Sequence, residues 1–321
     1  MHGMTAATSQ LSSTIVLADE VERALRDGLP VVALESTIIA HGLPRPRNLE
    51  VALELEKVLR DAGVVPATIA VIAGVPRVGL DAEQLDRIAG KGADPAAGEA
   101  IKASLRDLPV AMAKGADAAT TVAATAFLAH RAGIRVFATG GLGGVHREAS
   151  RTFDESADLT VLGRTPITVV SAGVKSVLDV AATLERLETL GITVVGYRTH
   201  RFPGFYVTDS GHALEWRVDD PSEVVAIMRA ADRLGTTGAI VVANPVAPDR
   251  QLDPGLHDRA LAGAIAAAET GGIHGKDVTP LLLDHIQRVT GGASLEANIN
   301  AVRGNVTVAA SIATAWAGAA R

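Results

Sequence analysis

The feature that most restricts the fold of this chain is a series of short apolar runs that alternate with helical patterns. Residues 31–34, 136–139, 167–170 and 193–197 are apolar or β-branched and too short for helices. Such runs are typical of strands buried on both faces of a parallel sheet. Because strand and helix alternate from about residue 110 to 200, we expect right-handed βαβ units.

This alternation predicts one large α/β domain, residues 15–321, with a mostly parallel central sheet flanked by helices. Residues 1–14 are small and polar and are expected to form a flexible arm. Further predicted elements are listed in chain order: a helix capped by Asn48 and ended by Gly63, a hairpin over 67–80, a strand over 110–113, a helix over 118–131, a strand over 239–243, and closing helices over 256–270, 279–289 and 294–317.

Charge and composition exclude several classes of protein. Hydrophobic residues make up 48% of the 321 residues, and the net charge is −6. A general binder of nucleic acid or anionic membrane needs a basic excess, so neither partner is expected. A small anionic ligand held by a few local cations stays open.

The chain has no cysteine, which excludes disulfides, thiolate nucleophiles and cysteine-ligated metals. A reduced, cytoplasmic setting fits, and no secretory signal pattern opens the chain. The longest weakly polar stretch, 306–320, falls short of the roughly 20 apolar residues that a membrane span needs.

Glycines 140, 141, 143 and 144 follow the run at 136–139. As a dinucleotide fingerprint the loop is weak, because His146 stands where a third glycine belongs. A glycine cluster at a strand end can instead expose N–H groups to a phosphate, and His146 and Arg147 favour that interpretation. The alternative is a tight structural turn.

Lys175 follows the apolar strand at 167–170. A lysine whose ammonium is desolvated has a lowered pKa and becomes a nucleophile for carbonyl-like carbons. The alternative is a surface lysine at a helix start, with its charge in water.

Three acidic residues are candidates for chemistry. Asp154 and Asp158 would share a face of a helix and suit Mg²⁺ or Mn²⁺, although solvated acids are the commoner case. Glu35 ends the strand at 31–34 and would be desolvated, as a general acid or base requires. Its alternative role is an ion pair with Arg45 or Arg47.

Several strings closely resemble the pseudouridine-5′-phosphate glycosidases, a family that shares these motifs with proteins named for indigoidine pigment synthesis. The resemblance covers about residues 15–317. The strings are ALESTIIAHG (33–42), PATIA (66–70), ATTVA (119–123), FATGGLGGVHR (137–147), TFDESAD (152–158), VANP (242–245) and SLEANI (294–299).

The resemblance implies a lyase or glycosidase of nucleotide metabolism and pyrimidine degradation, also called pseudouridylate synthase. It would cleave the C–C glycosidic bond of pseudouridine 5′-phosphate reversibly, giving uracil and ribose 5-phosphate, with Mn²⁺ (Mg²⁺ or another divalent cation being possible) in a homotrimer. The implied roles are a Schiff-base nucleophile at Lys175, a proton donor at Glu35, a metal ligand at Asp154, substrate contacts at Lys102, Val122, Ser156, Ala157 and Asp158, and a contact with the base at Asn298.

Two rival functions stay open at this point. One is another Schiff-base lyase or aldolase acting on a sugar phosphate, and the other is a non-catalytic sugar-phosphate-binding protein. Some family members carry a fused carbohydrate-kinase domain, and none is expected here because the chain ends at Arg321.

Overall fold

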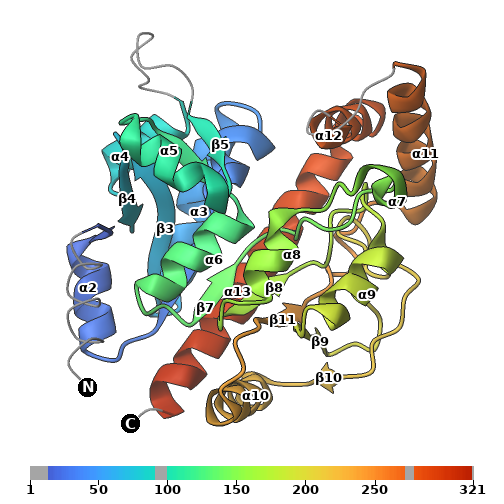
Figure 1. Ribbon diagram of the computed structural model, residues 1–321. Helices are drawn as coiled ribbons and strands as arrows, with labels where there is room; N and C mark the ends of the chain where they lie inside the picture. Colours follow the sequence, from blue (N-terminus) through green and yellow to red (C-terminus); the bar gives the residue numbers. More distant parts are fainter. Residues whose placement is uncertain (1–13, 91–99, 272–277, 320–321) are drawn as a thin grey trace.

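The computed structural model describes residues 14–90, 100–271 and 278–319. The arm predicted over 1–14 lies outside these ranges except for Thr14. The remainder confirms a single α/β domain with a mostly parallel sheet (Figure 1).

The centre of the domain is a sheet of eleven strands in the order β1-β4-β3-β2-β7-β8-β11-β9-β10, with β6 attached to β3 and β5 to β6. Among the described strand pairs, only β3 with β4 and β3 with β6 are antiparallel. The strands are β1 (Val16–Leu17), β2 (Val31–Leu34), β3 (Val65–Ile72), β4 (Val75–Val78), β5 (Ile101–Ala103), β6 (Ala118–Thr120), β7 (Val136–Ala138), β8 (Thr168–Ser171), β9 (Thr193–Tyr197), β10 (Arg217–Val218) and β11 (Ile240–Ala243).

Helices cover both faces of this sheet. They are α2 (Asp19–Arg26), the π-helical turn η1 (Ile38–Gly42), α3 (Arg47–Asp61), α4 (Ala82–Ile88), the 3₁₀ turn η2 (Leu105–Asp107), α5 (Leu108–Ala113), α6 (Val122–Arg131), α7 (Ala149–Thr152), α8 (Ala157–Leu162), α9 (Val180–Thr189), α10 (Pro221–Leu234), α11 (Pro254–Thr270), α12 (Val278–Val289) and α13 (Ala293–Ala319). Among these described helices, none is both long and apolar enough to cross a bilayer.

Alternate residues of each central strand enter different cores, as the pleat of a buried strand requires. Phe137 and Val169 pack in the core beneath α2, α6, α8 and α9. Val136 and Val170 pack in the core beneath α3, α10 and α13. Figure 1 shows α13 running diagonally across the molecule beside β7 and β8.

Two of the predicted elements were wrong. Residues 110–113 belong to helix α5 instead of a strand, with Pro109 in its first turn, where the missing N–H is harmless. The helix predicted over 118–131 begins only at Val122, because residues 118–120 form β6. This strand pairs with β3 and β5, a long-range contact that local periodicity does not reveal.

Asn48 does not cap α3 as predicted, since the helix begins one residue earlier, at Arg47. The buried Asn48 side chain instead donates hydrogen bonds to the carbonyls of Ile39, 2.8 Å away, and Ala89, 3.0 Å away. It therefore fixes the η1 turn, which follows Glu35, against α3 and the end of α4.

Asn48→Ala should lower the free energy of unfolding by about 2 kcal/mol or more, because two buried carbonyls lose their donor. Urea denaturation would measure this. The control is Asn300→Ala, whose side chain, within the described ranges, accepts a bond from the nearby Arg303 side chain alone; this variant should cost about 0.5 kcal/mol. Equal losses in both variants would contradict the role of Asn48.

Candidate active site

Glu35 directly follows β2, and the hydroxyl of Thr139 donates a hydrogen bond to its carboxylate. Burial raises the pKa of Glu35 above its usual value, and the charge of Lys175 and the Thr139 bond only partly oppose that rise. The alternative of an ion pair with Arg47 was wrong, because Arg47 binds Glu50 and Glu54.

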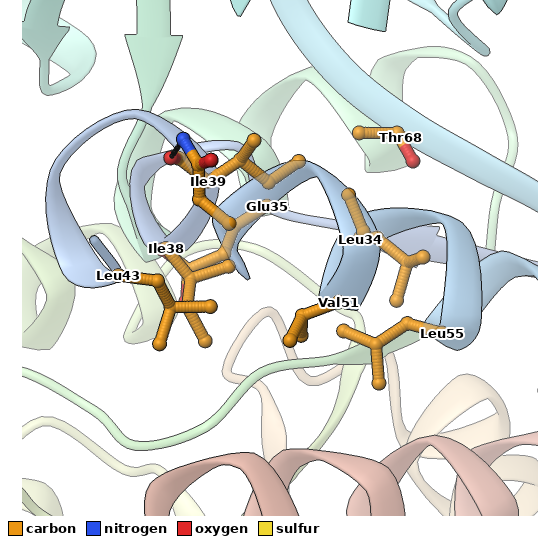
Figure 2. Close-up of a pocket in the computed structure, with 10 residues that line it drawn as sticks. Leu34, Glu35, Ile38, Ile39, Leu43, Val51, Leu55 and Thr68 are labelled. Atoms are coloured by element: carbon orange, nitrogen blue, oxygen red, sulfur yellow. Dashed lines mark hydrogen bonds between the residues drawn. The ribbon is translucent and has the colours of Figure 1, made fainter. Parts of the chain in front are cut away.

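Apolar side chains account for the desolvation of Glu35. A cavity of about 10 Å³ lies against it (Figure 2), and its lining residues are Leu34, Glu35, Ile38, Ile39, Leu43, Asn48, Val51, Ala52, Leu55 and Thr68. Such a space holds about one water molecule at most, so it is no ligand pocket. Most of the side chains that line this space are apolar and cannot hydrate the carboxyl.

Lys175 lies in the segment after β8 and is half-buried. Its N–H donates to the carbonyl of Leu142, 3.1 Å away, and the N–H of Leu142 donates to the carbonyl of Gly173 at 2.9 Å. Gly173 has a φ of +86°, and a Cβ there would lie 2.4 Å from the carbonyl oxygen of Pro203. The close approach requires glycine and places Lys175 beside the glycine loop.

Lys102 lies on β5 and forms a group of four charged residues with Glu35, Asp158 and Lys175. Partial desolvation and the charge of Lys175 lower the pKa of Lys102, while Asp158 and Glu35 act in the opposite direction. Glu35 in turn responds to Lys175, Asp158 and Lys102. The structure therefore brings these four residues close enough for their charges to interact, although they come from four distant parts of the chain.

Asp158 is the most constrained member of this group, with a relative exposure of 5%. Its two carboxylate oxygens accept the N–H of Ala123 at 2.9 Å and the N–H of Gly143 at 2.8 Å. These bonds join the first turn of α6 to the glycine loop and to α8. Val122, the first residue of α6, is buried beside them.

The glycine loop does not present all its amides to a ligand. The N–H groups of Leu142, Gly143 and Val145 donate to Gly173, Asp158 and Thr183, respectively. The glycines serve packing instead: a Cβ on residue 141, 143 or 144 would lie under 3 Å from Phe205, Ser156 or Thr183. The loop is thus a tight turn with three of its amides already bonded, and phosphate binding by the others stays a prediction.

His146 and Arg147 lie beyond this loop. The Nδ1 atom of His146 is 3.7 Å from the carboxylate of Asp154. Arg147 donates to the carbonyls of Val177 at 3.1 Å and Ser176 at 3.3 Å, so it holds the turn after Lys175. Substrate contact by either residue stays a prediction.

Asp154 and Asp158 do not share a helical face, because α8 begins at Ala157 and Asp158 is bound to amides. Glu155 pairs with Arg186. No cluster of three or more potential ligands occurs within the described ranges. Asp154 with His146 offers two side chains, which fits a divalent ion that keeps most of its ligands as water.

Asn298 and the segment 156–157 complete the predicted set. The Asn298 side chain projects from α13 toward Gly140, its Oδ1 is buried, and that oxygen has no hydrogen-bond partner within the part of the chain that the structure describes. Ser156 caps α8 by accepting the N–H of Asp158 at 3.2 Å, and Ala157 is exposed at the same helix start.

Reasoning from the sequence missed Thr139 and Asn305, which touch the site from β7 and α13. Asn305 is fully buried and donates to the carbonyl of Thr139 at 2.7 Å. Thr139 could have been found, because it directly follows β7 as Glu35 directly follows the neighbouring β2. Nothing in the spacing of Asn305 distinguishes it from any other polar residue on a long helix.

Comparison with known proteins gives a consistent result. The model of the family described as indigoidine synthase A like protein matches residues 20–315. A pseudouridine-5′-phosphate glycosidase of Saccharopolyspora erythraea is 64% identical over 303 residues, which cover 94% of this chain and 98% of that protein. The enzyme of the same name from Frankia alni is 65% identical, and the matched region covers 95% of this chain and 83% of that protein.

Solved structures agree. The crystal structure of the prealnumycin C-glycosynthase AlnA in complex with ribulose 5-phosphate has a TM-score of 0.87 and 35% identity, covering 95% of this chain and 98% of that one. An indigoidine synthase A-like protein from Thermotoga maritima has a TM-score of 0.82 and 35% identity, covering 94% and 95%.

The raised pKa of Glu35 predicts a pH-dependent stability. Protonation of the buried carboxyl contributes stability that is fully present below the pKa of the unfolded state, about 4.5. This contribution is lost as the pH rises through the higher pKa of the folded state. Glu35→Gln should therefore gain free energy of unfolding relative to wild type near pH 8, with no gain near pH 4.

Urea denaturation at both pH values would measure the difference, with the exposed Glu83→Gln as control. A stability gain for Glu35→Gln that is equal at both pH values would contradict the burial of this charge.

Proposed function

The chain belongs to the family of indigoidine synthase A like proteins, and from this premise we propose that it cleaves the C–C glycosidic bond of pseudouridine 5′-phosphate reversibly, to uracil and ribose 5-phosphate. The observation that carries the proposal is the group formed by Glu35, Lys102, Asp158 and Lys175 at the carboxyl edge of the sheet. The glycosidases that are 64% and 65% identical to the chain support the substrate.

In this proposal Lys175 supplies the nucleophile. Its amine bonds to C1′ of the sugar while the ring oxygen leaves and takes up a proton. Breaking the bond from C1′ to C5 of uracil then leaves the electron pair on C5, and C1′ becomes an imine carbon. Water releases ribose 5-phosphate from that imine and regenerates the lysine.

Glu35 supplies the proton that C5 of uracil takes up as the bond breaks. Because burial raises its pKa, the carboxyl holds a proton closer to neutral pH than an exposed glutamate would. The Oδ1 of Asn298, which has no hydrogen-bond partner among the described residues, is suited to accept an N–H of uracil. It approaches the loop at Gly140, one residue after Thr139, which contacts Glu35. The proton donor Glu35 and the proposed uracil contact Asn298 thereby lie near the same loop.

The sugar phosphate would be held by Lys102, the first turn of α6 at Val122 and the start of α8 at 156–158. The ammonium of Lys102 favours a phosphate, whereas the Ala123 N–H in the first turn of α6 is already bound to Asp158. Mn²⁺, if held by Asp154 and its water ligands, would supply further positive charge near the anionic substrate.

A homotrimer, a cytoplasmic location and a role in pyrimidine nucleotide degradation are parts of the same proposal. Their support is the resemblance of the chain to the pseudouridine-5′-phosphate glycosidases. Light scattering of the purified protein would measure the assembly.

A second candidate is another Schiff-base reaction on a sugar phosphate, such as C-glycoside synthesis. The structure of the C-glycosynthase in complex with ribulose 5-phosphate favours this candidate. It would retain Lys175 but would not require uracil as the leaving group.

Incubation with pseudouridine 5′-phosphate and Mn²⁺ should release uracil. Chromatography would measure this release. Lys175→Ala should lose more than about 1000-fold in kcat, because covalent catalysis is lost. Lys114→Ala, at an exposed lysine, is the matched control and should keep wild-type activity.

Wild-type protein that releases no uracil would contradict the glycosidase proposal and favour the second candidate. Uracil release by Lys175→Ala at the wild-type rate would remove the lysine from the mechanism.

A further inference from the structure

Thr139 and Glu35 are neighbours by sheet register. β2 and β7 run parallel, with Leu34 paired to Ala138. The next pair along the two strands is therefore Glu35 with Thr139. The Thr139 hydroxyl donates to Oε1 of Glu35, and Thr139 has a relative exposure of only 1%. The donor is fixed by the sheet itself and is shielded from water.

The main chain at Thr139 is anchored on two sides. Its N–H donates to the carbonyl of Val170 on β8 at 3.0 Å. Its carbonyl accepts the Nδ2 amide of Asn305 at 2.7 Å, and the Oδ1 of Asn305 accepts the side-chain amide of Asn244 at 2.9 Å. This chain of bonds leaves Thr139 little freedom to move.

The bond has a consequence for the acid. A carboxyl group carries its proton on one oxygen. As long as the Thr139 hydroxyl donates to Oε1, that proton lies on Oε2. The Thr139 contact thus selects both the orientation of the carboxyl group and the oxygen that can act as a donor.

We propose that Thr139 is a positioning residue for the reaction, which holds Glu35 by its Oε1 atom so that Oε2 delivers the proton to the leaving base. The anchors at Asn305 and Asn244 support this role from α13 and from the loop after β11. The inference rests on the proposed glycosidase function, since it needs Glu35 to act as the acid.

Loss of the hydroxyl should have a distinctive pH signature. The charged groups that face Glu35 are Lys175, Asp158 and Lys102, and they stay in place in a Thr139 variant. The Thr139 bond favours the ionised carboxylate, so its removal should raise the pKa of Glu35 further. Activity that depends on the protonated acid would then persist to higher pH.

The test compares Thr139→Val with Thr139→Ser in uracil release from pseudouridine 5′-phosphate, measured across pH. Thr139→Val should lower kcat by about 10- to 100-fold and move the alkaline limb of the profile to higher pH. KM should change much less, because Thr139 makes none of the proposed substrate contacts. Thr139→Ser, which keeps the hydroxyl, should restore most of the rate and the wild-type limb.

Thr165→Val is the matched control. Thr165 is a buried threonine before β8 whose hydroxyl donates to the carbonyl of Val161 at 2.7 Å. Its loss should affect stability without moving the pH profile. Borohydride trapping of ribose 5-phosphate should remain at the wild-type level in Thr139→Val, because imine formation uses Lys175, and this would show that the variant is folded.

An unchanged profile and kcat in Thr139→Val would overturn the proposal while leaving the glycosidase function intact. The same holds if Thr139→Ser is as slow as Thr139→Val with an unshifted limb. Failure of the wild-type protein to release uracil would instead overturn the function on which the proposal rests.

Discussion

The carboxylate of Asp158 is the contact on which the site depends most. By accepting the N–H groups of Ala123 and Gly143, it joins α6, the glycine loop and α8 into one unit. A buried carboxylate without such donors would cost several kcal/mol, so the three segments and the charge stabilise one another. The loop in turn holds the Lys175 segment, because the N–H of Leu142 donates to the carbonyl of Gly173 and its carbonyl accepts the N–H of Lys175. The position of Lys175 therefore depends on Asp158 through the glycine loop.

Much of this arrangement was predictable, because apolar strands that end in polar residues belong to a parallel sheet whose carboxyl edge collects ligands. Glu35 and Lys175 each follow a short buried strand, and the structure brings them into electrostatic contact as that rule requires. The desolvation of Glu35 could also be expected from Leu34, Ile38 and Ile39 around it in sequence.

The remaining features depend on contacts between distant segments. The glycines after β7 have the composition of a phosphate loop, yet Phe205, Ser156 and Thr183 occupy the space where side chains would be. Strand β6 forms only because β3 and β5 lie beside it. Lys102 and Asn298 carry no local signal of function, since neither spacing nor neighbours mark them before the fold brings them to the edge of the sheet.

In the proposed reaction, Lys175 at this edge of the sheet performs the covalent chemistry and Lys102 supplies positive charge. The most direct measurement is peptide mapping by mass spectrometry after incubation with ribose 5-phosphate and borohydride, which reduces an imine to a stable amine. The proposed mechanism predicts one adduct per chain, on the peptide that contains Lys175. An adduct on Lys102, or none on either lysine, would contradict it.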